Sequence, residues 1–185
     1  GCSDSAMGNR FFDYAAATPI DPVVLKQYHS ALTEGFANPS ATYSSGRQRA
    51  DLLAAARARI ARCLGAKPPE IILTSGSTEG INLAVQGVLE QYPDAGLVVG
   101  AVEHPAIFEL THRYQNRGRT IHVVPVSANG TVSVDELESI IDDDTVLVSI
   151  QYVNNEVGSV QPVTKIAAMI EKVRRSRKRR GVALP

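Results

Sequence analysis

The chain has 185 residues, of which 44% are hydrophobic and 21% are charged. This balance is typical of a soluble globular protein with one domain, or one and a half, and it excludes collagen-like, low-complexity and wholly disordered chains. No apolar run approaches the roughly 18 residues that cross a bilayer, so we expect no membrane segment. Two cysteines form neither a disulfide framework nor a zinc site, and a reducing, cytoplasmic location is the expectation.

The net charge is zero, but the charge is unevenly distributed. Seven of the 19 basic residues lie between Lys172 and Arg180, and no acidic residue follows Glu171. Residues 1–171 therefore carry a net charge of −7 and residues 172–185 a net charge of +7. A basic run could contact nucleic-acid phosphates, but basic residues near a helix C-terminus also complement the helix dipole and stay solvated. The run lacks the interleaved aromatic side chains of a single-strand binder, so we do not expect nucleic-acid binding.

Residues 1–10 lack the apolar segment of a secretory signal, and we interpret them as a cloning remnant or a frayed tail. Residues 11–185 are the expected folded region. There the pattern predicts helices at 22–33, 45–64, 78–92, 105–117, 134–141 and 163–177. It predicts strands at 71–74, 97–101, 120–124 and 145–150, with a lead-in to another at 181–184. Alternating apolar strands and amphipathic helices predict a three-layer α/β/α fold with a mostly parallel sheet.

The second predicted helix carries one of the two cysteines. Leu52, Ala55, Ile60 and Cys63 fall at helical steps on one apolar face. We therefore expect the Cys63 thiol to be buried and inert rather than nucleophilic.

Ligands of such sheets bind beyond the carboxyl ends of the strands, which directs attention to three polar loops. The first contains Gly76, Ser77 and Thr78 between a predicted strand and a predicted helix. We expect Gly76 to allow a tight turn and the amides and hydroxyls of Ser77 and Thr78 to hold one phosphate at the helix N-terminus. The alternative is an ordinary Ser/Thr helix cap.

The other two loops offer a histidine and two amides. His104 stands between a predicted strand and a helix that begins with Pro105. Its imidazole could stack on a flat ring or exchange a proton, or it could be an ordinary loop histidine. Asn154 and Asn155 follow the strand at 145–150 and could orient a ligand by hydrogen bonds, or simply form a turn.

Taken in order, five segments resemble the first half of a fold-type I, pyridoxal-phosphate-dependent enzyme of the class V aminotransferase family, and most closely the group I cysteine desulfurases. The similarity extends over about residues 11–185. The matching segments are Phe12–Pro19, Ala37–Ser40, Thr74–Glu79, Glu103–His104 and Val153–Gly158.

The resemblance implies roles for several of these residues. Ser77 and Thr78 would bind the phosphate of pyridoxal 5′-phosphate, and His104 would stack on its ring and could move protons. Asn155 would bind the phenolic oxygen of the cofactor and lie near the substrate carboxylate, with Asn38 near the substrate entrance. No residue is expected to bind a metal.

The implied reaction removes sulfur from L-cysteine. An enzyme thiolate attacks the substrate sulfur, leaving alanine and an enzyme persulfide that supplies iron–sulfur cluster or thio-cofactor assembly. The resemblance further implies a homodimer, and an iron–sulfur scaffold or another protein as the sulfur acceptor. The Schiff-base lysine and the nucleophilic cysteine of the family would follow Pro185, so we expect the large cofactor domain to be truncated and this chain alone to be inactive.

Two other interpretations stay open. The first is another class V enzyme, either a small-amino-acid aminotransferase or a kynureninase-like lyase. The second is a non-catalytic half-fold that binds nucleic acid through its basic C-terminus.

Overall fold

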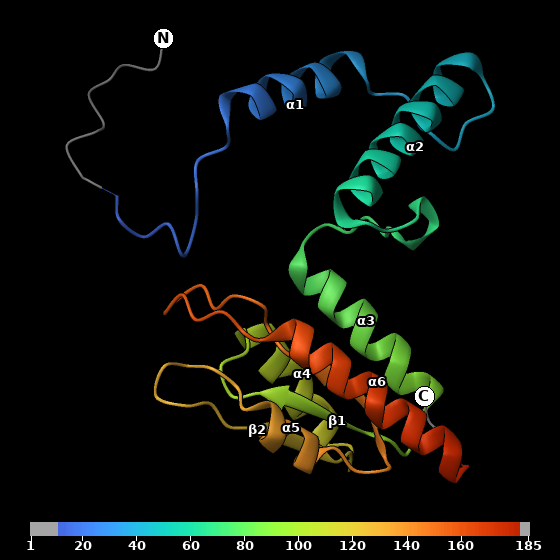
Figure 1. The fold of residues 1–185 in the computed structure, drawn as a ribbon. Coiled ribbons are helices and arrows are strands. Elements are labelled where there is room, and N and C mark those ends of the chain that lie inside the picture. Colours follow the sequence, from blue (N-terminus) through green and yellow to red (C-terminus); the bar gives the residue numbers. More distant parts are fainter. Residues whose placement is uncertain (1–10, 182–185) are drawn as a thin grey trace. The chain divides into compact units, whose positions relative to one another are not determined.

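The computed structural model describes residues 11–181, which form two compact units that divide between Leu73 and Thr74 (Figure 1). The expected tail at residues 1–10 and the expected strand lead-in at 181–184, apart from Gly181, lie outside the described residues.

The amino-terminal unit contains the helices α1 (Pro22–Glu34) and α2 (Ser44–Leu64) and the short 3-10 helix η2 (Pro68–Glu70). Asp21 begins α1 as predicted, because its carboxylate accepts hydrogen bonds from Val23 N at 2.8 Å and Val24 N at 3.4 Å. Gly65 ends α2 in the left-handed conformation, with φ of 65°.

The predicted burial of Cys63 is wrong. Cys63 is exposed, and so are Leu52 and Ile60 on the same face of α2. The buried apolar side of α2 is instead the one that carries Ala61, which is 1% exposed.

The predicted strand at 71–74 is also absent. Ile71 has an extended backbone, with φ of −95° and ψ of 114°, yet residues 71–74 form no ladder with the described strands. Ile72 is 70% exposed. An apolar run becomes a strand only when another strand supplies hydrogen bonds, and here none of the described strands does so.

The carboxyl-terminal unit contains the predicted alternation of helices and strands. Its elements are α3 (Ser77–Gln91), β1 (Gly96–Gly100), α4 (Pro105–Gln115), β2 (Ile121–Val124), α5 (Val134–Ile140), β3 (Thr145–Ser149) and α6 (Val163–Arg180). The strands are parallel and lie in the order β2-β1-β3, with Val98 of β1 opposite His122 and Val148.

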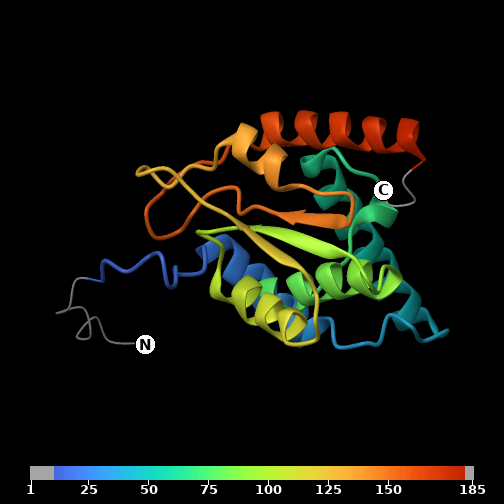
Figure 2. The same cartoon turned by 90° about the horizontal axis from the view of Figure 1, so that it is seen from below.

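Helices cover both faces of this sheet (Figure 2). Leu97 and Val99 of β1 pack against α3 and α4, whereas Val98 between them packs against α5 and α6. All three side chains are at most 1% exposed. Because successive strand residues point to opposite faces, a central strand with helices on both sides is apolar throughout. The three-layer α/β/α arrangement and its parallel sheet are therefore confirmed.

Candidate functional site

The loop after β1 presents an exposed histidine. His104 caps α4, and its Nδ1 accepts a hydrogen bond from Ala106 N at 3.1 Å. An Nδ1 that accepts a hydrogen bond leaves the ring proton on Nε2. One ring nitrogen of His104 thus bonds the first turn of α4, while the ring face and the Nε2–H are exposed to solvent.

The loop after β3 uses its first asparagine to hold the backbone. Asn154 Oδ1 accepts hydrogen bonds from Glu156 N and Val157 N, both at 2.9 Å. Its Nδ2 donates to Val102 O at 3.0 Å, which ties this loop to the one that carries His104. Asn154 therefore makes three hydrogen bonds within the protein, two through its Oδ1 and one through its Nδ2.

The second asparagine is available to a ligand. Asn155 is exposed, and its Oδ1 accepts a long hydrogen bond from Gln151 Nε2 at 3.4 Å. Its Nδ2 has no acceptor among residues 11–181. Two adjacent residues of the same type thus differ in function, since one closes the loop and the other presents a free amide.

A buried carboxylate lies between these two loops. Glu103 is 9% exposed and accepts hydrogen bonds from Ser149 Oγ at 3.3 Å and from Gln151 N. Burial raises the pKa of the Glu103 carboxyl, and the two hydrogen bonds partly oppose that shift. No role was predicted for Glu103 from the sequence, although a carboxylate that follows a buried strand so closely is a signal that could have identified it.

The N-terminus of α3 is open to an anion. α3 has no side-chain cap, so the amides of Ser77 and Thr78 in its first turn are not engaged by a side chain. Both residues are exposed, and their hydroxyls make no hydrogen bond within the described chain. Glu79 in the same turn bonds Ser75 instead, at 2.6 Å to Oγ and 2.7 Å to N. The Ser75 hydroxyl and then its amide lower the pKa of the Glu79 carboxyl.

The expected need for glycine at position 76 is wrong. Gly76 has φ of 165°, an extended conformation that any residue adopts. A Cβ built there would meet no atom within 4 Å. Gly76 thus leaves open space in front of the first turn of α3 rather than permitting a tight turn.

All three predicted loops lie toward the carboxyl edge of the sheet. The hydrogen bonds of Asn154 and Glu103 join the loops after β1 and β3. α3 packs along β1, and the end of α3 lies beside the start of that strand, where Arg119 bonds Leu89 O at 2.8 Å and Ala95 O at 2.9 Å. The helix and the strand therefore run in opposite directions. A helix of this length spans about 22 Å, so its first turn reaches the far edge of the strand.

Asn38 lies in the amino-terminal unit, between α1 and α2. Its Oδ1 accepts a hydrogen bond from Ser40 N at 2.9 Å, and its side chain is exposed. The structure therefore groups Ser77, Thr78, His104 and Asn155 in one unit and describes Asn38 in the other.

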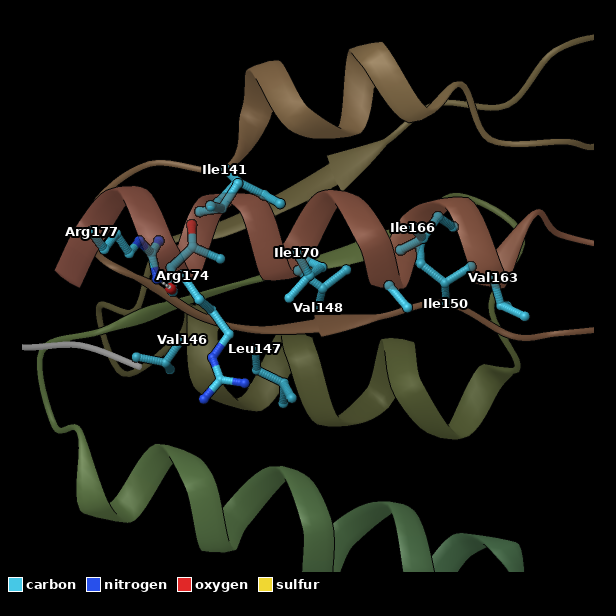
Figure 3. Close-up of a pocket in the computed structure, with 13 residues that line it drawn as sticks. Ile141, Val146, Leu147, Val148, Ile150, Val163, Ile166, Ile170, Arg174 and Arg177 are labelled. Atoms are coloured by element: carbon cyan, nitrogen blue, oxygen red, sulfur yellow. Dashed lines mark hydrogen bonds between the residues drawn. The ribbon is translucent and has the colours of Figure 1, made fainter. Parts of the chain in front are cut away.

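An apolar groove of about 390 Å³ runs along β3 beneath α6, away from these polar groups (Figure 3). Figure 3 shows Ile170 of α6 facing Val148 of β3, with Ile150 and Ile166 further along the groove. The groove offers packing surface rather than reactive groups. Within residues 11–181, no cluster of His, Cys, Asp or Glu could hold a metal ion, and no helix has the length and apolarity to span a membrane.

Comparison with known proteins gives consistent matches. The family model described as Aminotransferase class-V matches residues 10–175. The cysteine desulfurase IscS of Dictyoglomus turgidum is 36% identical over 164 residues, and that of Neisseria meningitidis serogroup C is 37% identical over 159 residues. These alignments include 88% and 84% of this chain but only 42% and 39% of the two relatives, so the chain spans about two fifths of their length.

Solved structures agree with these matches. A NifS-like protein superposes with a TM-score of 0.84 at 34% identity, over 87% of this chain and 45% of that one. A structure titled SspA in complex with cysteine gives a TM-score of 0.84 at 32% identity, over 89% and 48% of the two chains.

Proposed function

Since this chain belongs to the class-V aminotransferase family, we propose that it is the amino-terminal part of a pyridoxal-phosphate-dependent cysteine desulfurase. Such an enzyme converts L-cysteine to alanine and holds the sulfur as an enzyme persulfide for iron–sulfur cluster or thio-cofactor assembly. The observation that carries the proposal is that relatives 36–37% identical over most of this chain are named cysteine desulfurases. The neighbour titled as a complex with cysteine supports L-cysteine as the substrate.

The residues present fit the cofactor. A phosphate needs several hydrogen-bond donors and a positive potential, which the uncapped first turn of α3 and the hydroxyls of Ser77 and Thr78 supply. A flat ring needs an exposed aromatic face and an amide donor, which His104 and Asn155 supply.

Each side chain would then have one task. Ser77 and Thr78 would bind the phosphate, and the Nδ1 bond of His104 would hold its imidazole in one orientation against the ring. Asn155 Nδ2 would donate to the phenolic oxygen of the cofactor and lie near the substrate carboxylate, and Asn38 would lie near the substrate entrance. When bound, pyridoxal phosphate would supply an electron sink for the bonds of the substrate α-carbon.

The cofactor site can be tested on the 185-residue chain. Isothermal titration calorimetry with pyridoxal 5′-phosphate should detect weak non-covalent binding. Ser77→Asp should abolish it, because it replaces a hydroxyl proposed to bind the phosphate with a carboxylate that repels it, whereas the Glu79 carboxylate of the same turn is bonded to Ser75. Ser45→Asp is the matched control, since it places the same charge in the first turn of α2 and should leave binding unchanged. Equal affinity in Ser77→Asp and the unsubstituted chain would contradict the proposed site.

The activity requires the longer protein that we propose to carry this chain. Alanine and sulfur release from L-cysteine would support the desulfurase. Amino transfer between small amino acids, or cleavage of kynurenine, without sulfur release would support another class V enzyme. We further propose that the protein is a cytoplasmic homodimer that passes sulfur to an iron–sulfur scaffold or a similar acceptor.

The basic end of α6 favours a structural role over nucleic-acid binding. Lys172 pairs with Glu138 at 2.7 Å, and Arg180 pairs with Asp143 at 2.6 Å. Arg177 is 3% exposed and donates to Thr145 O at 2.8 Å and to Asp142 O. Much of the basic charge thus attaches α6 to its own unit, and we do not expect nucleic-acid binding.

A further inference from the structure

Glu103 is a buried charged group that the proposed function leaves without a task. Its carboxylate accepts the Ser149 hydroxyl at 3.3 Å and the Gln151 N–H, both at the carboxyl end of β3. No cation pairs with Glu103 among the described residues. A buried carboxylate without a cation is costly for the fold, so stability alone does not account for Glu103 at this position.

The backbone around Glu103 is arranged to accommodate it. A Cβ at Gly100, the last residue of β1, would lie 3.2 Å from Glu103 Oε1 and 3.4 Å from Ile150 Cδ1. The contact with Glu103 Oε1 is tighter than an ordinary van der Waals distance, and the contact with Ile150 is at the lower limit of that range. Gly100 therefore leaves the space in which the carboxylate reaches from the β1 loop to the β3 loop.

Glu103 is linked closely to both residues that are proposed to contact the cofactor ring, His104 and Asn155. It is the residue next to His104 in the chain. It also accepts the backbone N–H of Gln151, whose side chain donates to Asn155 Oδ1 at 3.4 Å. The bond from Asn154 to Val102 O joins the same two loops on the other side of Glu103.

We propose that Glu103 is a positioning residue of the proposed cofactor site, which holds the loop of Asn155 against the loop of His104 and so sets how both side chains approach a bound ring. This inference rests on the proposed function. It is specific to the ring, because no hydrogen bond links Glu103 to Ser77 or Thr78 within the described residues. Removing the carboxylate should therefore affect ring binding and leave phosphate binding unchanged.

The test uses the ¹⁵N-labelled 185-residue chain with two probes, pyridoxal 5′-phosphate and inorganic phosphate. Glu103→Ala should weaken binding of pyridoxal 5′-phosphate about tenfold, while phosphate affinity changes less than about twofold. Glu103→Gln keeps an acceptor oxygen for one of the two donors and should give an intermediate loss. Glu109→Gln removes the same charge from an exposed position on α4 and should match the unsubstituted chain. The side-chain amide signals of Asn155 should shift in both Glu103 variants and stay fixed in Glu109→Gln.

The outcomes separate this inference from the proposed function. An equal loss of affinity for both probes in Glu103→Gln would mean that Glu103 only supports the fold, and would overturn the inference. If the unsubstituted chain binds no pyridoxal 5′-phosphate, the proposed function fails on its own. The Asn155 signals then decide whether Glu103 positions that loop: a shift in Glu103→Gln upholds this and unchanged signals overturn it. Should Glu103→Ala not fold, Glu103→Gln carries the comparison.

Discussion

Asn154 donates to Val102 O at 3.0 Å, whereas its neighbour Asn155 keeps an amide nitrogen with no acceptor in the described chain. The first side chain closes the loop after β3 onto the loop after β1, and the second is left facing solvent. Two predictions about identical truncations follow from this difference.

Asn154→Ala should reduce the free energy of unfolding by about 1–3 kcal/mol, because it removes one donor bond and two acceptor bonds. Asn155→Ala is the matched control and should change it by less than about 0.5 kcal/mol. Urea unfolding of both variants measures the two values. Equal destabilisation would show that the division of roles between the two asparagines is incorrect.

The cap of α4 predicts a second stability effect. His104→Ala removes the acceptor for Ala106 N and should cost about 0.5–2 kcal/mol. His104→Asn should recover most of the loss, because asparagine is a favourable cap. His112→Ala, on the exposed side of the same helix, should have little effect. In ¹⁵N spectra of the neutral ring, the His104 proton should be on Nε2, and a proton found on Nδ1 would rule out the cap.

Burial of Glu103 predicts how stability depends on pH. A carboxyl whose pKa is raised on folding binds its proton more tightly in the native state. Its contribution to stability is therefore present below the unfolded pKa and is lost as pH rises through the folded pKa. In Glu103→Gln that loss should disappear, so the variant should gain stability relative to the unsubstituted chain as pH rises above about 4.3, the ordinary value for glutamate. Urea midpoints measured across this range give the comparison, and parallel pH profiles would contradict a raised pKa.

Local chemistry explains why much of the fold could be predicted. The start of α1 depends on Asp21 and its immediate neighbours, and the end of α2 depends on Gly65, so the sequence contains the whole cause. The strand at 71–74 and the burial of Cys63 depend on what packs against them, which no local pattern contains. Residues 102–105 and 151–158 could be placed at one edge because parallel strands share their carboxyl edge.

The roles within the site were harder to predict. The partners of Glu103 lie 46 and 48 residues away in the chain, so its position between the loops is visible only in the structure. Likewise, nothing in the pair Asn154 and Asn155 tells which amide turns inward. Sequence patterns could thus locate the loops, but the folded loops decide which side chains stay free.

The attachment of α6 predicts unequal effects of its arginines. Arg177→Ala removes a buried guanidinium that donates to two carbonyls, Thr145 O and Asp142 O, and should cost about 2–4 kcal/mol. Arg179→Ala, at an exposed position of the same helix, should cost less than about 0.5 kcal/mol. Urea unfolding measures both. A steep, salt-dependent affinity for oligonucleotide that both variants reduce equally would instead favour the nucleic-acid interpretation.

The open side of β3 predicts self-association of this chain. Among residues 11–181, β3 is an edge strand, and the groove beside it is lined mainly by aliphatic side chains of β3 and α6 (Figure 3). Unpaired edge groups next to an apolar surface favour contact with another chain. Sedimentation velocity should show association that increases with concentration. Ala167→Lys places a charge at the groove and should reduce self-association, whereas Ala168→Lys, which is also exposed but does not line the groove, should not. If both lysines reduce association equally, net charge and not the groove controls it, and the edge of β3 is not the contact surface.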